Sequence, residues 1–338
     1  MREFDLKSYD YHLPVDLIAK YPVSPKEDAR LLVFNRKDKT IVHTSFKYLF
    51  DFVPKDYLFV FNDTKVIKAR VFGKKTTGAK VEVLFHKKIS DGFLVQIRGK
   101  IKVDDIIILD QNFYIKVCKL FEDGYRLVRC FHLNQEIFEI SKMCDLIGHV
   151  PLPPYIKRED EQLDIEEYQS VFAKNYGAVA APTASLHFSE SMMRYVLEHY
   201  KKVFLTLHVG AGTFASVESK DIREHKIHSE TLLASKQSID SIKKAKSIIC
   251  VGTTAMRSVE FLARIGDEEY EGECDIFLHL GNPPIKTSAL LTNFHLPKSS
   301  LIMLVSSMVG LDTCMWLYDE AIKHQYRFYS YGDGMLIL

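Results

Sequence analysis

Polar and glycine-rich residues follow several apolar runs in the second half of the sequence. Glycines 210, 212 and 252 allow a backbone to approach a ligand closely, and free N–H groups at helix starts favour an anionic group. Arg257 suits a bidentate contact with a carboxylate. Together these residue types predict a binding site built from five segments: APTASLHF (181–188), LHVGAGTF (207–214), VGTTAMR (251–257), LTNFHLPKSS (291–300) and YSYGDG (329–334).

Histidines in three of these segments, His187, His208 and His295, have the side chain best suited to proton transfer near neutral pH. The alternative is that they are buried or capping residues, which is common for histidines that follow apolar residues. GAGTF (210–214) lacks the third glycine and the downstream acid of a dinucleotide-binding loop, which weakens an interpretation as an NAD site.

A metal site is the other chemistry to weigh. EHKIHSE (224–230) places His225, His228 and Glu230 close together, and zinc sites with an open position use three such ligands. The His-x-x-His spacing differs from the i, i+4 spacing of H-E-x-x-H, and no second cluster accompanies it. We therefore expect a hydrogen-bonded loop here rather than a catalytic metal.

The elements that carry these segments alternate between strand and helix. We expect strands at 177–181, 203–209, 247–251, 275–280 and 289–294, and helices at 189–200, 236–246, 254–265, 300–310 and 312–324. Such alternation predicts an α/β fold with a mainly parallel or mixed sheet and helices on both faces. Ligands bind at the carboxyl ends of parallel strands, so all five segments should meet at one cleft.

An earlier part of the chain has a different pattern. Six or seven short runs rich in β-branched and aromatic residues lie between residues 56 and 131, separated by turn signals, and predict a small antiparallel barrel or sandwich. A helix-like stretch (135–146) and the linker PLPPY (151–155) follow. We expect residues 1–60 and 151–338 to form the α/β domain and residues 61–150 an inserted β-barrel domain.

Composition limits the class of protein. The 338 residues carry 45 Lys+Arg and 44 Asp+Glu, for a net charge of +1. Six cysteines show no paired spacing, which predicts reduced thiols and a cytoplasmic protein. The N-terminus lacks the apolar region of a signal peptide, and the longest apolar stretch, 301–310, is about half of a membrane span. We expect no membrane association.

The near-zero net charge hides a basic segment. Residues 65–102 contain eleven Lys or Arg and two acids, a local charge of +9, whereas 159–167 and 267–275 each contain six acids and no base. Lysines on a solvated strand face also protect a sheet edge. Nine uncompensated charges on one small domain nevertheless favour binding to a phosphate backbone.

Several blocks together resemble the S-adenosylmethionine:tRNA ribosyltransferase-isomerase family. The resemblance runs from DYHLPVDLIAKYPVSP (10–25) to the C-terminus in unchanged order. It is carried by FNDTKVIKARVFG (61–73), PLPPYIKRED (151–160), GAVAAPTASLHFS (177–189), TLHVGAGTF (206–214), EHKIHSE (224–230), VGTTAMRSVE (251–260), LLTNFHLPKSSL (290–301) and YSYGDGMLI (329–337).

The resemblance implies an α/β domain with an inserted barrel and a reaction that uses S-adenosylmethionine as ribosyl donor. The acceptor is 7-aminomethyl-7-deazaguanine at the tRNA wobble position, the product is epoxyqueuosine, and adenine and methionine leave. General acid–base groups suffice, so we expect no metal and no cofactor, since S-adenosylmethionine is a substrate. The implied acid–base residues and their acidic partners are His187, His208, His295, Asp63 and Asp333.

The resemblance also implies substrate-binding residues, with Arg257 and the loop 210–213 holding the methionine carboxylate. They are Asn62, Arg70, Thr183, Gly210, Gly212, Thr213, Thr253, Thr254, Arg257, Asn293 and Lys298. For the tRNA anticodon arm we predict contacts from Lys74, Lys75, Lys87 and Lys88 of the barrel. We expect a monomer. Two other functions stay open: an S-adenosylmethionine-dependent RNA methyltransferase and a non-catalytic RNA-binding protein.

Overall fold

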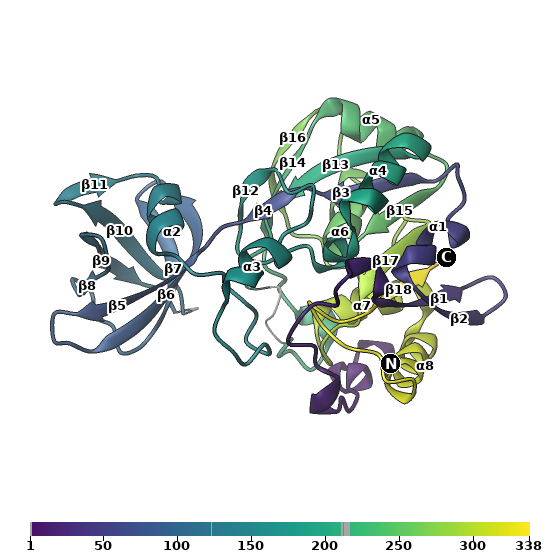
Figure 1. The fold of residues 1–338 in the computed structure, drawn as a ribbon, viewed down its shortest axis with the longest axis horizontal. Helices are drawn as coiled ribbons and strands as arrows, with labels where there is room; N and C mark the ends of the chain where they lie inside the picture. Colours follow the sequence, from purple (N-terminus) through teal and green to yellow (C-terminus); the bar gives the residue numbers. More distant parts are fainter. Residues whose placement is uncertain (1, 123, 211, 213–216) are drawn as a thin grey trace.

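The computed structural model describes residues 2–122, 124–210, 212 and 217–338. It has two parts, a larger α/β part and a barrel that projects from one side of it (Figure 1). The α/β part is built on a nine-stranded sheet of order β16-β14-β13-β3-β15-β17-β18-β1-β2. Its strands are β1 (Arg30–Asn35), β2 (Thr40–Ser45), β3 (Leu58–Asn62), β13 (Lys201–Leu207), β14 (Glu230–Ala234), β15 (Ile248–Val251), β16 (Tyr270–Cys274), β17 (Ala289–Asn293) and β18 (Gly334–Ile337).

The sheet is mixed, which confirms the predicted fold class. Strands β13, β3, β15 and β17 run parallel to their neighbours in the centre. Strand β18 is antiparallel to β17, and β14 and β16 extend the other side as antiparallel strands. The parallel centre places the carboxyl ends of four strands at one edge, as a ligand site in an α/β fold requires.

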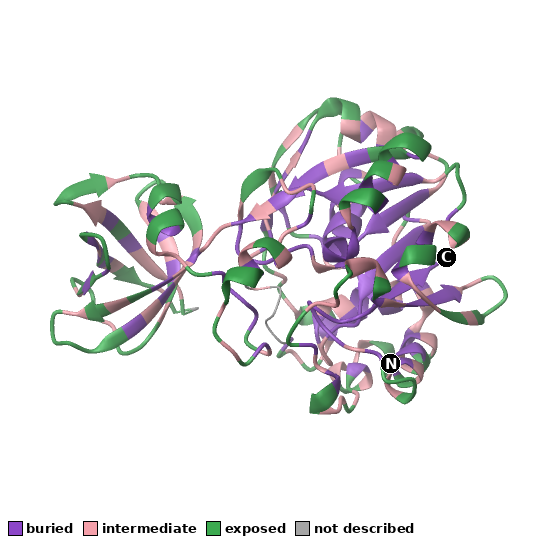
Figure 2. Ribbon diagram, in the orientation of Figure 1, coloured by how far each residue is buried: buried purple, intermediate pink, exposed green. Residues whose placement is uncertain are grey.

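Both faces of the sheet are covered, so its central strands are largely buried and mostly apolar (Figure 2). Val60 points into one core with α5 (Lys236–Lys244), α6 (Thr253–Leu262), α7 (Ser300–Val309) and α8 (Leu311–Lys323). Phe59 and Phe61 point to the opposite core with α1 (Leu49–Phe52) and α4 (Glu190–His199). The predicted N-cap Ser189 accepts a hydrogen bond from the Met192 N–H at 3.2 Å.

Two predicted strands and one predicted helix are wrong. The apolar run 275–280 has no ladder, because buried Ile276 and Leu278 pack into the core from an irregular segment that follows β16. The run 177–181 contributes only the end of β12 (Asn175–Ala178), which pairs with β4 (Thr64–Val66) outside the main sheet. The stretch 135–146 forms β11 (Gln135–Ile137) and the shorter helix α2 (Ser141–Ile147).

The barrel closes through a pairing between β9 and β10, so that six antiparallel strands form a ring and β11 extends it. Inward positions alternate with outward ones, and Val71, Val83, Val95 and Ile115 fill the interior. Its strands are β5 (Arg70–Lys75), β6 (Lys80–Ile89), β7 (Gly92–Arg98), β8 (Ile106–Ile108), β9 (Phe113–Leu120) and β10 (Arg126–His132).

The barrel is joined to the sheet by a narrow neck, in which β4 and β12 lie between the two parts (Figure 1). The backbones of Arg70 and His149 exchange hydrogen bonds of 3.3 and 2.7 Å where the chain enters and leaves the barrel. Strand β3 belongs to the sheet up to Asn62, and α3 (Gln162–Glu167) follows the barrel. The division of the chain at residues 61–150 stays a prediction.

No single helix in the described ranges is long and apolar enough to cross a membrane. Helices α7 and α8 pass that test only as a pair, and they meet at an angle of 113°.

Candidate functional site

The five polar segments do meet at the carboxyl edge of the parallel strands. They line one small pocket, to which each contributes at least one residue. Asn293 joins two of them, because its Oδ1 accepts from the Thr183 hydroxyl at 2.8 Å and its Nδ2 donates to His187 Nε2 at 3.2 Å. The pocket volume is about 50 Å³. That is space for a water molecule or two, whereas drug-sized ligands occupy about 300–1,000 Å³.

His295 lines this pocket and His187 contacts its residue Asn293, and both histidines are buried. His187 stacks on Phe46 with ring centroids 4.0 Å apart, and His295 Nε2 lies 2.8 Å from the Thr292 hydroxyl. Loss of solvation lowers the pKa of each to about 3. Both rings are therefore neutral at pH 7, and neither is suited to act as a general acid there.

Asn62 and Asp63 crosslink neighbouring strands. The Asn62 amide donates to the Leu207 carbonyl at 2.9 Å and to Thr254 Oγ1 at 3.3 Å, while its oxygen accepts from the Leu207 and Thr64 N–H groups. The Asp63 carboxylate accepts from the Thr206 hydroxyl at 2.6 Å. The buried Asn62 amide is thus occupied by the protein itself, and Thr253 and Thr254 line the small pocket beside it.

Arg257 is not positioned as an open carboxylate clamp. It is buried and forms an ion pair with Glu230, and it donates to the carbonyl oxygens of Ile276 at 3.2 Å and Cys274 at 3.3 Å. Glu230 also accepts the Gly210 N–H at 3.0 Å. The arginine therefore anchors the loop that begins at Gly210. Thr213, predicted to share the carboxylate site, lies outside the described residues.

Three other predicted residues face neither the small pocket nor the cleft described below. Arg70 pairs with Glu82 at 3.1 Å and donates to the Leu152 carbonyl at the neck. Lys298 pairs with Asp10. The buried Asp333 carboxylate accepts the Arg30 and Arg327 N–H groups at 3.1 and 2.8 Å. In this structure each of the three makes contacts that hold separate segments of the fold together.

A much larger cleft lies between the barrel and the start of β14. Its volume is about 740 Å³. The barrel contributes β6, β7 and the start of α2, and the sheet contributes the segments 208–210 and 228–231 together with Gly212. The cleft shares Val209 with the small pocket, so the two spaces adjoin. By size, this cleft is where a substrate as large as a nucleoside fits.

His208 is the predicted acid–base residue that faces the cleft. Its Nδ1 lies 2.8 Å from the Thr64 hydroxyl, which fixes the ring and leaves Nε2 for a substrate. Gly177 packs against the ring so closely that a Cβ there would lie 2.7 Å from Nδ1. Burial lowers the pKa of His208, and the negative charge of Asp63 opposes part of that effect.

Two further histidines face the same cleft. His86 comes from β6, with Nε2 3.2 Å from the Gln96 side-chain oxygen, and burial lowers its pKa to about 4. His228 covers Gly212, where a Cβ would lie 2.7 Å from the imidazole. The sequence analysis missed His86 as a site residue, because only the placement of the barrel brings it opposite His208. His228 was considered only as a possible metal ligand, in a segment expected to be a hydrogen-bonded loop rather than a metal site.

A metal cluster is not formed by His225, His228 and Glu230. Glu230 pairs with Arg257 instead, and the His225 ring packs edge-on against Phe277 at 5.5 Å. Within the described residues, the one group of histidines and acids close enough to share an ion lies elsewhere, on β2 and α8.

The basic segment of the barrel is partly neutralised by acids. Lys75 pairs with Asp105 at 2.7 Å, Lys88 with Glu139 at 2.6 Å, and Lys87 with Glu273 of β16 across the cleft. Over residues 61–150 the charges are 16 Lys or Arg and 11 Asp or Glu, because acids cluster after residue 102. Lys74 lines a groove on the barrel beside the exposed Phe72. The domain is basic, but less so than the segment 65–102 indicates.

Comparisons with known proteins confirm the resemblance seen in the sequence. The profile of a family described as queuosine biosynthesis protein matches residues 6–337. The chain is 56% identical over 347 residues to S-adenosylmethionine:tRNA ribosyltransferase-isomerase of Helicobacter pylori strain G27, covering 100% of both chains. It is 54% identical over 340 residues to the enzyme of that name from Campylobacter jejuni, covering 98% of each.

A solved structure agrees with these sequence matches. S-adenosylmethionine tRNA ribosyltransferase from Thermotoga maritima superposes with a TM-score of 0.56 at 29% identity, covering 98% of this chain and 100% of that one. Family profile, full-length relatives and fold all coincide. The chain is therefore a member of the S-adenosylmethionine:tRNA ribosyltransferase-isomerase family, and it is an enzyme.

Proposed function

We propose that this enzyme transfers and isomerises the ribosyl group of S-adenosylmethionine onto 7-aminomethyl-7-deazaguanine at the wobble position of tRNA. The product is epoxyqueuosine-tRNA, and adenine and methionine are released. The observation that carries the proposal is the cleft between barrel and sheet, of about 740 Å³, in a chain that matches its relatives over their whole length. The wobble nucleotide would have to turn out of the anticodon loop to enter it.

The chemistry requires proton transfers. The sulfonium acidifies the ribose C5′ protons, adenine must gain a proton to leave, and the acceptor amine must lose one to attack. His208 and His86 lie on opposite walls of the cleft as neutral imidazoles, so they are placed to accept the proton that C5′ or the amine loses, and the imidazolium formed in this way can pass a proton to adenine. His187 and His295 support the loops of the adjoining pocket. We propose that this reaction requires no metal or redox cofactor.

The barrel supplies the surface for the anticodon arm. Lys87 and Lys88 line the cleft, and Lys74 and Lys75 line the separate barrel groove. Exposed ion pairs contribute about 0–1 kcal/mol, so RNA phosphates can compete with Glu139 and Glu273 for these lysines. We further propose that the enzyme acts as a monomer in the cytoplasm.

The products distinguish this function from its alternatives. The purified enzyme is incubated with S-adenosylmethionine and tRNA that carries 7-aminomethyl-7-deazaguanine, and the small molecules are separated. We expect one adenine and one methionine for each nucleoside modified. S-adenosylhomocysteine would instead identify a methyltransferase. Bound tRNA with no small-molecule product would identify an RNA-binding protein.

A further inference from the structure

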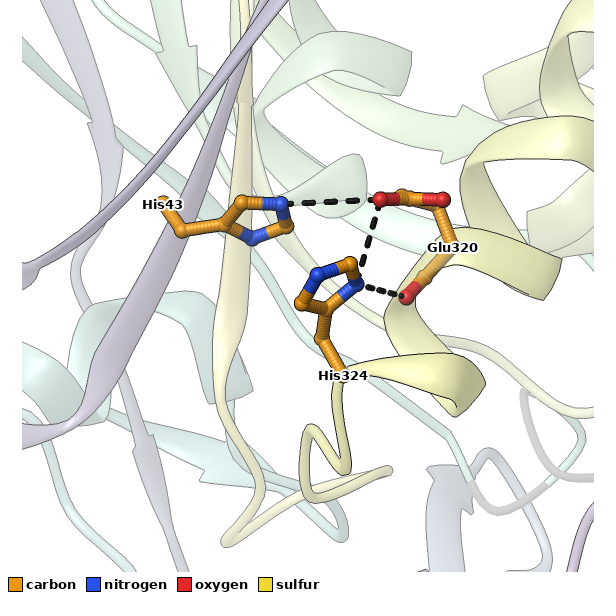
Figure 3. A group of neighbouring side chains, drawn as sticks. All are labelled: His43, Glu320 and His324. Carbon is orange, nitrogen blue, oxygen red and sulfur yellow. Dashed lines mark hydrogen bonds and ion pairs between the residues drawn. The ribbon is translucent and has the colours of Figure 1, made fainter.

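Three potential metal ligands gather on the surface at the edge of the sheet, away from both pockets. His43 lies on β2, while Glu320 and His324 lie one turn apart near the end of α8 (Figure 3). Glu320 Oε1 is 3.7 Å from His43 Nε2 and 3.1 Å from His324 Nδ1. All three ligand atoms lie within 4.8 Å of one another.

These separations suit a small divalent ion. Zinc binds nitrogen and carboxylate oxygen at about 2.0–2.1 Å, so tetrahedral ligands stand roughly 3.3 Å apart. The Glu320 distances of 3.7 and 3.1 Å fall on either side of that value. His43 and His324 are exposed, which leaves a coordination position for water. Two imidazoles and one carboxylate are a ligand set typical of zinc.

The surroundings of His43 resemble the support that metal-binding histidines receive. Its Nδ1 lies 2.8 Å from the hydroxyl of Tyr326, which directs Nε2 toward Glu320.

Two features limit the affinity. The rings of His43 and His324 are stacked with centroids 4.2 Å apart, and His324 Nδ1 lies 3.0 Å from the Glu320 carbonyl oxygen, so the rings must turn and that contact must be given up before both can point at one ion. The Arg30 guanidinium lies 3.9 Å above the Tyr326 ring and adds a positive charge nearby. These costs place the site below the four-ligand zinc sites in affinity.

We propose that His43, Glu320 and His324 bind one divalent transition-metal ion of the zinc type. The ion would connect the edge strand β2 to α8 and so stabilise this edge of the sheet. The site is independent of the transferase reaction, because none of its ligands lines the cleft or the small pocket.

The test is a titration of the full-length, metal-free enzyme with Zn²⁺ alone at pH 7.5, followed by calorimetry. We expect one ion per chain with a dissociation constant on the order of 1 μM, at least tenfold weaker binding in His324→Gln, and about tenfold weaker binding in Tyr326→Phe. Zn²⁺ should raise the Tm of the wild type but not that of Glu320→Gln.

His199→Gln is the matched control. His199 also ends a helix, and its Nδ1 contacts the carbonyl four residues earlier, as His324 does. Its substitution should leave the affinity unchanged. The proposal is overturned if no ion binds at about 100 μM Zn²⁺, or if the control weakens binding as much as His324→Gln does.

Discussion

Arg257 and Glu230 form a buried ion pair, and Glu230 also accepts the Gly210 N–H. The pair connects α6 to the start of β14, which forms one wall of the cleft. Because both groups are buried, removing one leaves the other without compensation for its lost hydration. The pair therefore holds Glu230 and Gly210, two residues of the cleft wall, in position.

Arg257→Met should lower the free energy of unfolding by about 3–5 kcal/mol, the cost of orphaning a buried charge. Urea unfolding measures it. Arg223→Met, which breaks an exposed pair with Asp221, is the control and should change stability little. If Arg257→Met were as stable as the wild type and only its KM for S-adenosylmethionine were raised, the arginine would bind the substrate instead.

His208→Gln should reduce adenine release by about 10²-fold or more, because it removes a proton-transfer group from the cleft. The variant should fold normally, since His208 is only half-buried. His86→Gln should reduce the same rate, and its effect should combine with that of His208→Gln. Unchanged turnover in either variant removes that histidine from the mechanism.

Acid should destabilise the enzyme through its buried histidines. His187 and His295 each have a pKa of about 3 in the folded state and of about 6.5 in the unfolded chain. The unfolded chain therefore binds more protons below pH 6.5, and stability falls as the pH drops from 6.5 toward 3, by up to ~1.4 kcal/mol per pH unit for each histidine. Thermal unfolding of His187→Gln between pH 7.5 and 4.5 should show a shallower decline than the wild type. An equal slope would mean that His187 is protonated in the fold.

Lys74→Gln should weaken binding to all tRNAs to a similar extent, whatever their sequence. It should also reduce the magnitude of the slope of log affinity against log salt concentration by about one, because one phosphate contact is lost. Lys323→Gln, on α8 far along the chain from the barrel, serves as the control and should leave that slope unchanged. If both variants bind tRNA like the wild type, the barrel groove beside Phe72 is not the RNA surface.

Much of the architecture follows from sequence patterns. Runs of β-branched residues at close spacing leave no room for helices between residues 56 and 131, so a barrel is their natural arrangement. Alternating strands and helices then place the polar segments after β13, β15 and β17 at one edge. The strand predicted at 275–280 is wrong because hydrophobic residues can be buried without pairing in a sheet. Ile276 and Leu278 are buried, but they belong to no strand.

The site itself was harder to predict because it depends on pairing across the chain. Nothing in VGTTAMR indicates that Arg257 meets a glutamate 27 residues earlier. The lysines looked uncompensated because Glu273 and Glu139 lie far from Lys87 and Lys88 in sequence. The main cleft needs the barrel to face β14, and local sequence patterns do not encode that placement.

We propose that ribosyl transfer takes place in the cleft between barrel and sheet. Ser141 lines that cleft at the start of α2, and Ser191 occupies the first turn of α4 on the exposed surface elsewhere. The decisive measurement is the rate of adenine release by Ser141→Trp and Ser191→Trp at equal folded concentration. We predict a loss of at least about tenfold in Ser141→Trp, because the indole occupies space in the cleft that the substrate needs, and a wild-type rate in Ser191→Trp. Wild-type rates in both variants would contradict the account.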